Sequence, residues 1–184
     1  MTRFKICGLR EARHAVTAAE SGASFLGFVF VQGVRRQLTE KQGKDIIAGY
    51  RKLSGEHGPA LVGLFANQTV EEVNRIVLNC GLDCVQLCGD EPPEYWAQVD
   101  SPIIKQVKIN IRSCQDDAVK EALNRVEDVL AAGHKVLLDS YEPGHLGGTG
   151  RTFDWTIARR IAELHNIVLA GGLTPENVNQ AIEH

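Results

Sequence analysis

The chain has 184 residues, of which 43% are hydrophobic and 23% charged, and its formal net charge is -3. This composition is typical of a globular domain with a full apolar core. The small negative charge gives no reason to expect nucleic acid or a membrane surface as a partner. No apolar run approaches the ~20 residues that a membrane helix needs, and the N-terminus MTRFKICG lacks the apolar core of a signal peptide. We therefore expect a cytoplasmic protein.

The chain alternates short apolar runs with stretches of helical period. Strands are predicted at 4–7, 25–31, 60–65, 83–87, 103–107, 136–138 and 166–170. Helices are predicted between and after them, at 12–19, 39–53, 69–81, 92–96, 116–132, 153–164 and from 174 onward. The sequences TEKQ at 39–42 and TVEE at 69–72 have the pattern of capping boxes, which open two of these helices.

Seven βα units without a long linker indicate parallel strands joined by helical crossovers. The strands are continuous apolar runs, as expected where both faces of a parallel sheet are covered. A doubly wound sheet and a (β/α) barrel both fit this pattern. Because small or polar groups end several different strands, the barrel is favoured.

The end of the chain bears on the barrel prediction, since the chain stops inside the seventh helix. We expect an α/β fold of the (β/α)8 TIM-barrel type with the eighth βα unit absent from this sequence, and one phosphate-binding domain over 1–184. The usual barrel has ~250 residues, so the natural polypeptide is expected to continue for roughly 20–30 residues. The alternative is an open barrel with exposed strand edges.

An odd number of cysteines in a chain of this size indicates free thiols in a reducing compartment. The five are Cys7, Cys80, Cys84, Cys88 and Cys114. Three of them recur at a spacing of four residues, which on a helix would form a stripe able to bind a metal ion. However, Gly81 and the run CVQL at 84–87 favour a strand there. We therefore expect no metal site.

Two groups at predicted strand ends can move protons. Asp139 directly follows the apolar run 136–138, and Cys7 ends the first strand. In parallel α/β folds, ligands bind at the carboxyl ends of the strands. A thiol with a lowered pKa can act as a base, and a carboxyl with a raised pKa as an acid. The alternatives are a buried structural thiol and a loop carboxylate bonded to nearby amides.

Glycine-rich loops and an arginine pair are candidates for anion binding. The glycines Gly147, Gly148 and Gly150, and the pair Gly171 and Gly172, offer unobstructed backbone amides that suit a phosphate. Turn geometry with positive φ is the alternative explanation for each. Arg36, next to Arg35 in the loop after the second strand, can grip a carboxylate through its planar guanidinium. The alternative is a solvated basic loop.

A set of motifs in a fixed order resembles one enzyme family. The motifs are KICGL at 5–9, GFVF at 27–30, GLFAN at 63–67, VQLCGDE at 85–91, LLDS at 137–140, GGTGRTFDW at 147–155 and LAGGLTPENV at 169–178. They look like the phosphoribosylanthranilate isomerases of tryptophan biosynthesis, over essentially the whole chain. The resemblance implies a (β/α)8 barrel and an isomerisation without metal or organic cofactor. The implied reaction is the Amadori rearrangement of N-(5-phosphoribosyl)anthranilate to 1-(2-carboxyphenylamino)-1-deoxyribulose 5-phosphate.

The resemblance also implies roles for single residues. The general base of the family falls on Cys7, its general acid on Asp139, and its arginine for the anthranilate carboxylate on Arg36. The phosphate of this small-molecule substrate would rest on 147–150 and 171–172. A monomer or a homodimer is expected. The chain departs from the family in Cys88, where a histidine is usual, and in lacking the phosphate loop of the eighth strand.

Two other functions compete with this one. Another phosphosugar isomerase of the same barrel type, such as the one of the histidine pathway, uses two aspartates, and the cysteine at position 7 argues against it. A non-catalytic binder of a phosphorylated metabolite, or an inactive fragment, belongs to a different class. The absent eighth unit is the feature that favours this second alternative.

Overall fold

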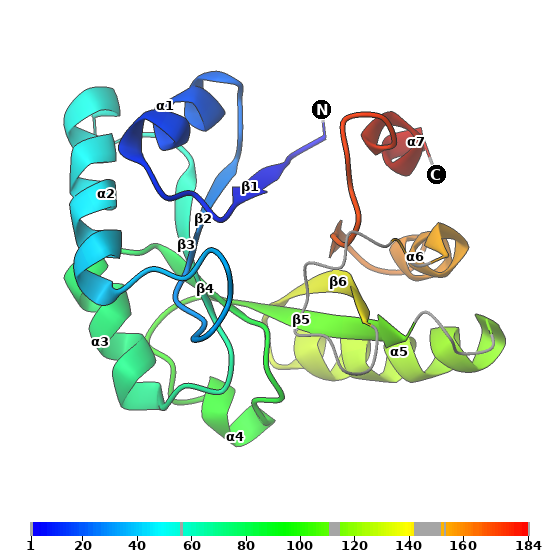
Figure 1. Cartoon of the computed structure of the whole chain (residues 1–184). Helices are drawn as coiled ribbons and strands as arrows, with labels where there is room; N and C mark the ends of the chain where they lie inside the picture. The colour runs from blue at the N-terminus through cyan, green and yellow to red at the C-terminus, as the bar shows by residue number, and fades with distance from the viewer. Residues whose placement is uncertain (1, 56, 111–114, 142–151, 153, 184) are drawn as a thin grey trace. The chain divides into compact units, whose positions relative to one another are not determined.

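The computed structural model describes residues 2–55, 57–110, 115–141, 152 and 154–183 (Figure 1). They form two compact units, Met1–Ile103 and Ile104–His184, and each unit alternates strands with helices. Among the residues described, no helix is both long enough and apolar enough to cross a membrane.

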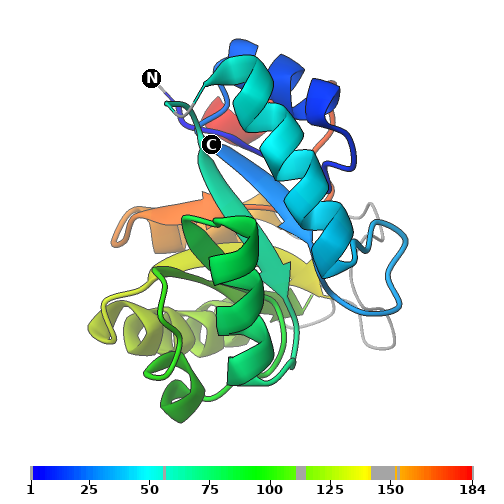
Figure 2. The ribbon, with the colours of Figure 1, turned by 90° about the vertical axis from the view of Figure 1, so that its left-hand side faces the viewer.

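The first unit has four strands in sequential order. Its elements are β1 (Lys5–Cys7), α1 (Ala12–Glu20), β2 (Phe25–Val29), α2 (Glu40–Ser54), β3 (Ala60–Phe65), α3 (Val70–Cys80), β4 (Cys84–Leu87) and α4 (Pro93–Trp96). Each strand pairs in parallel with the next, with Cys7 opposite Gly27, Gly27 opposite Val62, and Val62 opposite Cys84. These four residues therefore lie on one face of the sheet. The helices α1, α2 and α3 lie side by side along the sheet (Figure 2).

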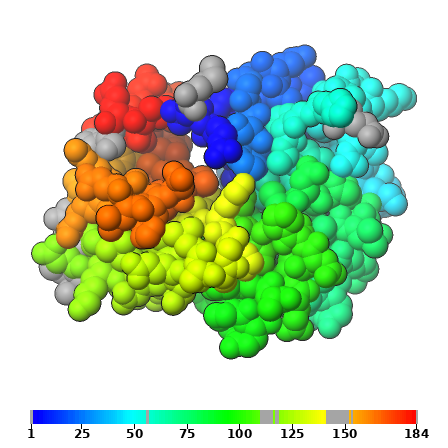
Figure 3. Space-filling model, turned by 180° about the vertical axis from the view of Figure 1, so that it is seen from behind, coloured from blue at the N-terminus to red at the C-terminus, as the bar shows by residue number. Residues whose placement is uncertain are grey.

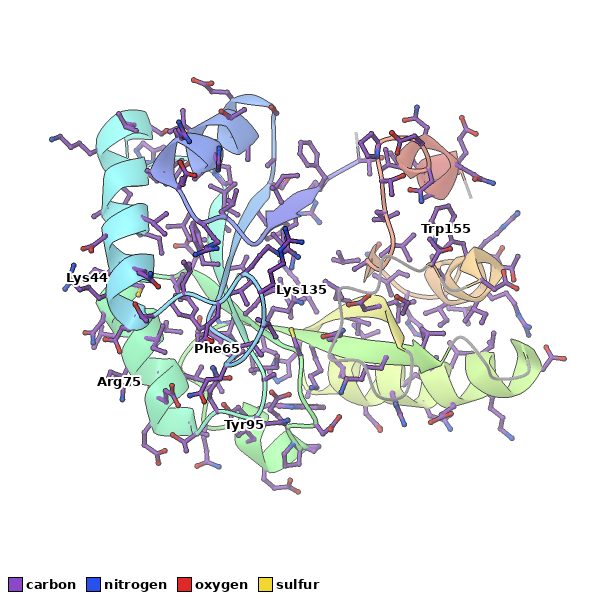
Figure 4. All side chains as sticks on the ribbon, viewed as in Figure 1. Lys44, Phe65, Arg75, Tyr95, Lys135 and Trp155 are labelled. Atoms are coloured by element: carbon purple, nitrogen blue, oxygen red, sulfur yellow. The ribbon has the colours of Figure 1, made fainter. Side chains whose placement is uncertain are left out.

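The core of the first unit is closed by aromatic and β-branched side chains. The rings of Phe30 and Phe65 stack with centroids 5.4 Å apart, and Phe65, labelled in Figure 4, is fully buried.

At the start of α2, Thr39 and Gln42 form the predicted capping box, since each side chain bonds the backbone N–H of the other. At the start of α3, the Thr69 hydroxyl accepts the N–H of Glu72, which is one of the two bonds of the predicted capping box; the reciprocal bond from the Thr69 N–H to the Glu72 side chain is not formed.

The second unit continues the same alternation. Its elements are β5 (Ile103–Asn110), α5 (Gln115–Ala131), β6 (Lys135–Tyr141), α6 (Trp155–Ala162), β7 (Ile167–Leu169) and α7 (Val178–Glu183). The strands β5, β6 and β7 pair in parallel, with Lys108 opposite Asp139 and Leu138 opposite Leu169. The helices α5 and α6 lie side by side at the surface (Figure 3), joined by an ion pair of 2.8 Å between Arg160 and Asp116.

Three sequence predictions of element boundaries are corrected in this unit. β5 does not end at Val107 but continues to Asn110. β6 does not end before Asp139, because Ser140 and Tyr141 continue its pairing with β5. The last helix does not begin at Thr174. The Asn177 side chain accepts the Thr174 N–H at 2.7 Å and donates to the Gly172 carbonyl at 2.9 Å, so a turn precedes α7. Asp139 therefore lies inside a strand, which holds its backbone more firmly than a loop would.

Candidate active site

The carboxyl end of β1 presents the Cys7 thiol, which is free and half-buried. Its neighbour across the sheet is Gly27, where a Cβ atom would lie 2.7 Å from the Cys7 sulfur. Any side chain at position 27 would therefore displace the thiol. The glycine of the GFVF motif provides the space in which the sulfur lies.

Arg36 contacts the same strand end from the loop after β2. Its Nη1 donates a hydrogen bond of 2.7 Å to the backbone carbonyl of Cys7. The arginine side chain lies over Gly8, where a Cβ atom would come within 2.5 Å of Arg36 Cδ and Nη1, and Gly8 has a φ of +79°. A guanidinium has several N–H donors, so this one bond leaves others for a ligand. The structure thus brings the predicted Arg36 and Cys7 together.

A row of interacting polar side chains on the same face of the sheet was not predicted from the sequence. Lys5 and Cys7 are alternate residues of β1 and share a face. The Lys5 ammonium donates to the side-chain oxygen of Gln86 on β4. The Gln86 amide in turn lies 3.2 Å from the Cys88 sulfur, and Gln86 is only 5% exposed. The sequence signal that could have revealed this row is Gln86 itself, a polar residue inside the apolar run CVQL at 84–87.

The other residues of the GLFAN and VQLCGDE motifs join two loops. The buried carboxylate of Glu91 accepts the backbone N–H of Asn67 at 2.9 Å and that of Gly89 at 3.1 Å. The Asn67 side chain accepts the N–H of Asp90 at 2.8 Å, and the Trp96 indole donates to the Glu91 carbonyl. These contacts fix the segments that follow β3 and β4 against each other.

The cysteines at 80, 84 and 88 do not form the helical stripe considered above. Cys80 ends α3, Cys84 begins β4, and Cys88 follows that strand. Burial, with a smaller contribution from the Glu40 carboxylate, raises the pKa of the Cys80 thiol to about 11. Within the described ranges, no three His, Cys, Asp or Glu side chains are grouped so that they could hold a metal ion.

In the second unit, Asp139 is held between a strand neighbour and a glycine turn. Its Oδ2 accepts a hydrogen bond of 2.8 Å from Nε2 of Gln106 on β5. On the other side lies Gly171, after β7, where a Cβ atom would be 2.6 Å from Asp139 Oδ1 and 2.8 Å from the Ser140 nitrogen. The predicted Asp139 and Gly171 are thus brought together, and Gln106 joins them without having been predicted.

The two anion-binding loops differ in what the structure describes. Gly171 and Gly172 have φ values of +91° and +63°, so both adopt the left-handed region that favours glycine. Positive φ was the alternative explanation for these glycines, and it does not exclude binding through their amides. The predicted Gly147, Gly148 and Gly150 lie outside the described residues.

Comparison with known proteins identifies the family. The family model of N-(5'phosphoribosyl)anthranilate (PRA) isomerase matches residues 4–184. The N-(5'-phosphoribosyl)anthranilate isomerase of Geobacter metallireducens is 40% identical over 183 residues, which are 100% of this chain and 83% of that protein.

Solved structures agree with the sequence comparison. Mutually generated monomers of the dimeric phosphoribosylanthranilate isomerase from Thermotoga maritima match with a TM-score of 0.78 and 30% identity, over 100% of this chain and 82% of that one. A phosphoribosylanthranilate isomerase in complex with reduced 1-(o-carboxyphenylamino)-1-deoxyribulose 5-phosphate matches with a TM-score of 0.76 and 29% identity, over 100% and 82%.

These similarities confirm the parallel α/β fold of the (β/α)8-barrel type, of which the described residues supply seven strands. The match covers the ordered motifs from β1 to α7. The chain belongs to the N-(5'-phosphoribosyl)anthranilate isomerase family, the isomerases of tryptophan biosynthesis.

Proposed function

We propose that the chain catalyses the Amadori rearrangement of N-(5'-phosphoribosyl)anthranilate, with Cys7 as general base and Asp139 as general acid. The observation that carries this proposal is the family match over 4–184, which includes both residues. A relative binds a reduced form of the rearranged product, 1-(o-carboxyphenylamino)-1-deoxyribulose 5-phosphate, and this supports the substrate class. The reaction consists of proton transfers, which protein side chains can perform themselves.

In the first step, the protonated Asp139 carboxyl donates its proton to the ring oxygen of the furanose. The bond between that oxygen and C1 breaks, and its electron pair stays on the oxygen. The lone pair of the anthranilate nitrogen forms the C=N bond of a Schiff base. An acid is needed here because the ring oxygen is a poor leaving group without a proton.

In the second step, the Cys7 thiolate removes the proton from C2. The electrons of the C–H bond form a C=C bond, and those of the C=N bond return to nitrogen. The enolamine then tautomerises to the ketone. The thiolate rather than the thiol is the reactive form of cysteine, and an acid and a base with distinct environments can run both steps at one pH.

The ends of the substrate need fixed partners so that the reacting atoms are held in place. We assign the anthranilate carboxylate to Arg36, whose guanidinium is held at the end of β1 by the Cys7 carbonyl. We assign the phosphate to the amides of Gly171 and Gly172, whose conformation with positive φ suits an anion-binding turn.

The function is tested by adding the substrate to the purified protein and following the loss of the substrate's fluorescence. The role of Arg36 is tested in the same assay with an Arg36→Met variant. Arg36→Met is expected to raise KM about 10- to 100-fold, because a hydrogen bond to a charged group contributes about 1.5–3 kcal/mol. kcat should change less, because the carboxylate is bound in both ground and transition states. The exposed neighbour Arg35 provides the control, and Arg35→Met should keep the parent KM.

An unchanged KM in Arg36→Met would remove Arg36 from carboxylate binding. A protein that binds the substrate without turnover would support the non-catalytic metabolite binder instead. Turnover of the corresponding histidine-pathway substrate alone would support the other phosphosugar isomerase.

The contact between Gly171 and Asp139 leads to a separate prediction. Gly171→Ala should lower the free energy of unfolding and also lower kcat, because the new Cβ would push against the Asp139 carboxylate. Gly133→Ala in the same unit is the matched control, since Gly133 has a φ of +80° but no atom within 4 Å of its Cβ position. In both variants the free energy of unfolding should fall by about 1–2 kcal/mol, because alanine is strained in the left-handed backbone conformation.

In Gly171→Ala the free energy of unfolding, measured by denaturant unfolding, should fall by a further amount of about 1–3 kcal/mol because the new methyl group overpacks the site. Only this variant should lose activity. Equal stabilities and equal kcat values for the two variants would show that the close approach of Gly171 to Asp139 has no consequence.

A further inference from the structure

Gln106 is a polar residue in the middle of β5 whose side chain bonds Asp139. In the parallel register, Gln106 lies opposite Leu137 and Lys108 lies opposite Asp139. Alternate residues of a strand share a face, so Gln106 and Asp139 lie on the same face of the sheet. The distance from Gln106 Nε2 to Asp139 Oδ2 is 2.8 Å, which lies within the ordinary range for an N–H···O hydrogen bond.

This bond makes the two carboxyl oxygens of Asp139 different. The Gln106 amide nitrogen carries only N–H donors and no acceptor. A proton on Oδ2 that pointed at this nitrogen would therefore meet another proton. Oδ2 accepts the Gln106 N–H, so a carboxyl proton is directed away from the Gln106 amide. Oδ1 lies toward Gly171, the residue without a side chain, at 2.6 Å from its Cβ position.

We propose that Gln106 is a positioning residue for the general acid. It fixes the rotation of the Asp139 carboxyl and keeps the transferable proton directed away from the Gln106 amide. This assignment rests on the proposed function, in which Asp139 protonates the ring oxygen. A glutamine suits the task because its amide does not titrate and donates the bond both before and after the proton has left. After the transfer, the same donor stabilises the carboxylate that forms.

A merely structural role for this bond predicts a different outcome. If Gln106 only satisfied its own polar group in the strand, its loss would lower stability and leave the catalytic pH profile in place. A positioning role requires that the profile changes. The pH dependence of kcat therefore separates the two roles.

The first variant is Gln106→Met, which keeps the length of the side chain and removes the donor. It is expected to lower kcat about 10- to 100-fold, because misplacing a catalytic group by about 1 Å costs up to 10²-fold. KM should change less than threefold. The alkaline limb of the kcat profile should move to higher pH, because removal of a hydrogen bond to the carboxylate raises the pKa of the acid.

Gln98→Met is the matched control. Gln98 donates a bond of 2.7 Å to the Glu94 carbonyl, so the substitution makes the same chemical change in the first unit. It should leave kcat and both limbs of the profile as in the parent protein.

The second variant, Gln106→Glu, keeps the shape and makes the donor titratable. At low pH the introduced carboxyl is protonated and can donate to Asp139 as the amide does. At higher pH it is ionised and repels the Asp139 carboxylate. The ratio of its kcat to that of the parent protein should therefore fall at least tenfold as the pH rises from about 5 to 8, because the neighbouring Asp139 carboxylate raises the pKa of the introduced carboxyl from its ordinary value of about 4.3 into this range.

The assignment is overturned if Gln106→Met keeps the parent kcat and pH limb. If Gln106→Met does not fold, Gln106→Glu decides, and a constant kcat ratio over the pH range overturns the assignment. A parent protein without turnover, or full activity in Asp139→Asn, overturns the proposed function and this assignment with it. Loss of activity in Asp139→Asn together with an unaffected Gln106→Met overturns the positioning role alone.

Discussion

Cys7→Ser is expected to lower kcat by about 10²- to 10⁴-fold, the usual contribution of a positioned general base. The substitution keeps the size of the side chain, so the space opposite Gly27 stays filled. A serine hydroxyl is far less acidic than a thiol and supplies almost no anionic base near neutrality. KM should change little, because proton removal from C2 occurs only in the transition state.

Cys88→Ser provides the control for Cys7→Ser. Both are half-buried thiols that take part in no disulfide, and both substitutions exchange sulfur for oxygen in the first unit. Cys88→Ser should retain most of the parent kcat, since we assign no proton transfer to Cys88. A Cys7→Ser variant with near-normal kcat would remove Cys7 from the mechanism, and an equal loss in both variants would point to damage of the sheet end instead.

Asp139→Asn should reduce turnover to a similar or greater extent while the protein stays folded. The amide has the shape of the carboxyl, and its oxygen can still accept the bond from Gln106. It cannot deliver a proton to the ring oxygen, so ring opening loses its acid. The loss should appear in kcat at every pH, measured in the same fluorescence assay beside a thermal unfolding curve.

The matched control for this variant is Asp116→Asn on α5. The Asp116 side chain is 85% exposed and pairs with Arg160 at the surface. Surface ion pairs contribute about 0–1 kcal/mol, so this variant should keep its fold and its activity. If Asp139→Asn fails to fold, Asp139 is a structural carboxylate and the acid must be sought elsewhere.

The fold was predictable to the level of its elements because apolar runs and helical periods mark buried strands and amphipathic helices. The strand ends were less predictable. Polar residues at 139–141 end the apolar run, yet they continue β6, because parallel pairing with β5 satisfies their backbone groups. The start of α7 was also misplaced. Thr174 and Pro175 are typical of a helix start, but the Asn177 side chain closes a turn over them.

The candidate site could be predicted only where a motif points to it. The sequence predicts Cys7 and Asp139 at strand ends and Arg36 in a loop that follows a strand, and these positions mark them as candidates, although Asp139 lies inside β6 in the structure. The contact of Arg36 with the Cys7 carbonyl joins residues 29 positions apart. The bond from Gln106 to Asp139 joins residues 33 positions apart. Such pairs depend on strand register, which the sequence pattern alone does not specify to a single residue.

The Arg36 guanidinium donates its hydrogen bond to the backbone carbonyl of Cys7 and not to the thiol. Every amino acid has that carbonyl, so the arginine keeps its anchor whatever side chain replaces the cysteine. In the roles that we propose, binding of the anthranilate carboxylate by Arg36 and removal of a proton by Cys7 can therefore change independently during evolution or engineering. A variant silenced at position 7 should still load its ligand, and would serve as a trap for crystallising the unreacted complex. The same separation lets a library of residues at position 7 be screened for new chemistry on one unchanged binding surface.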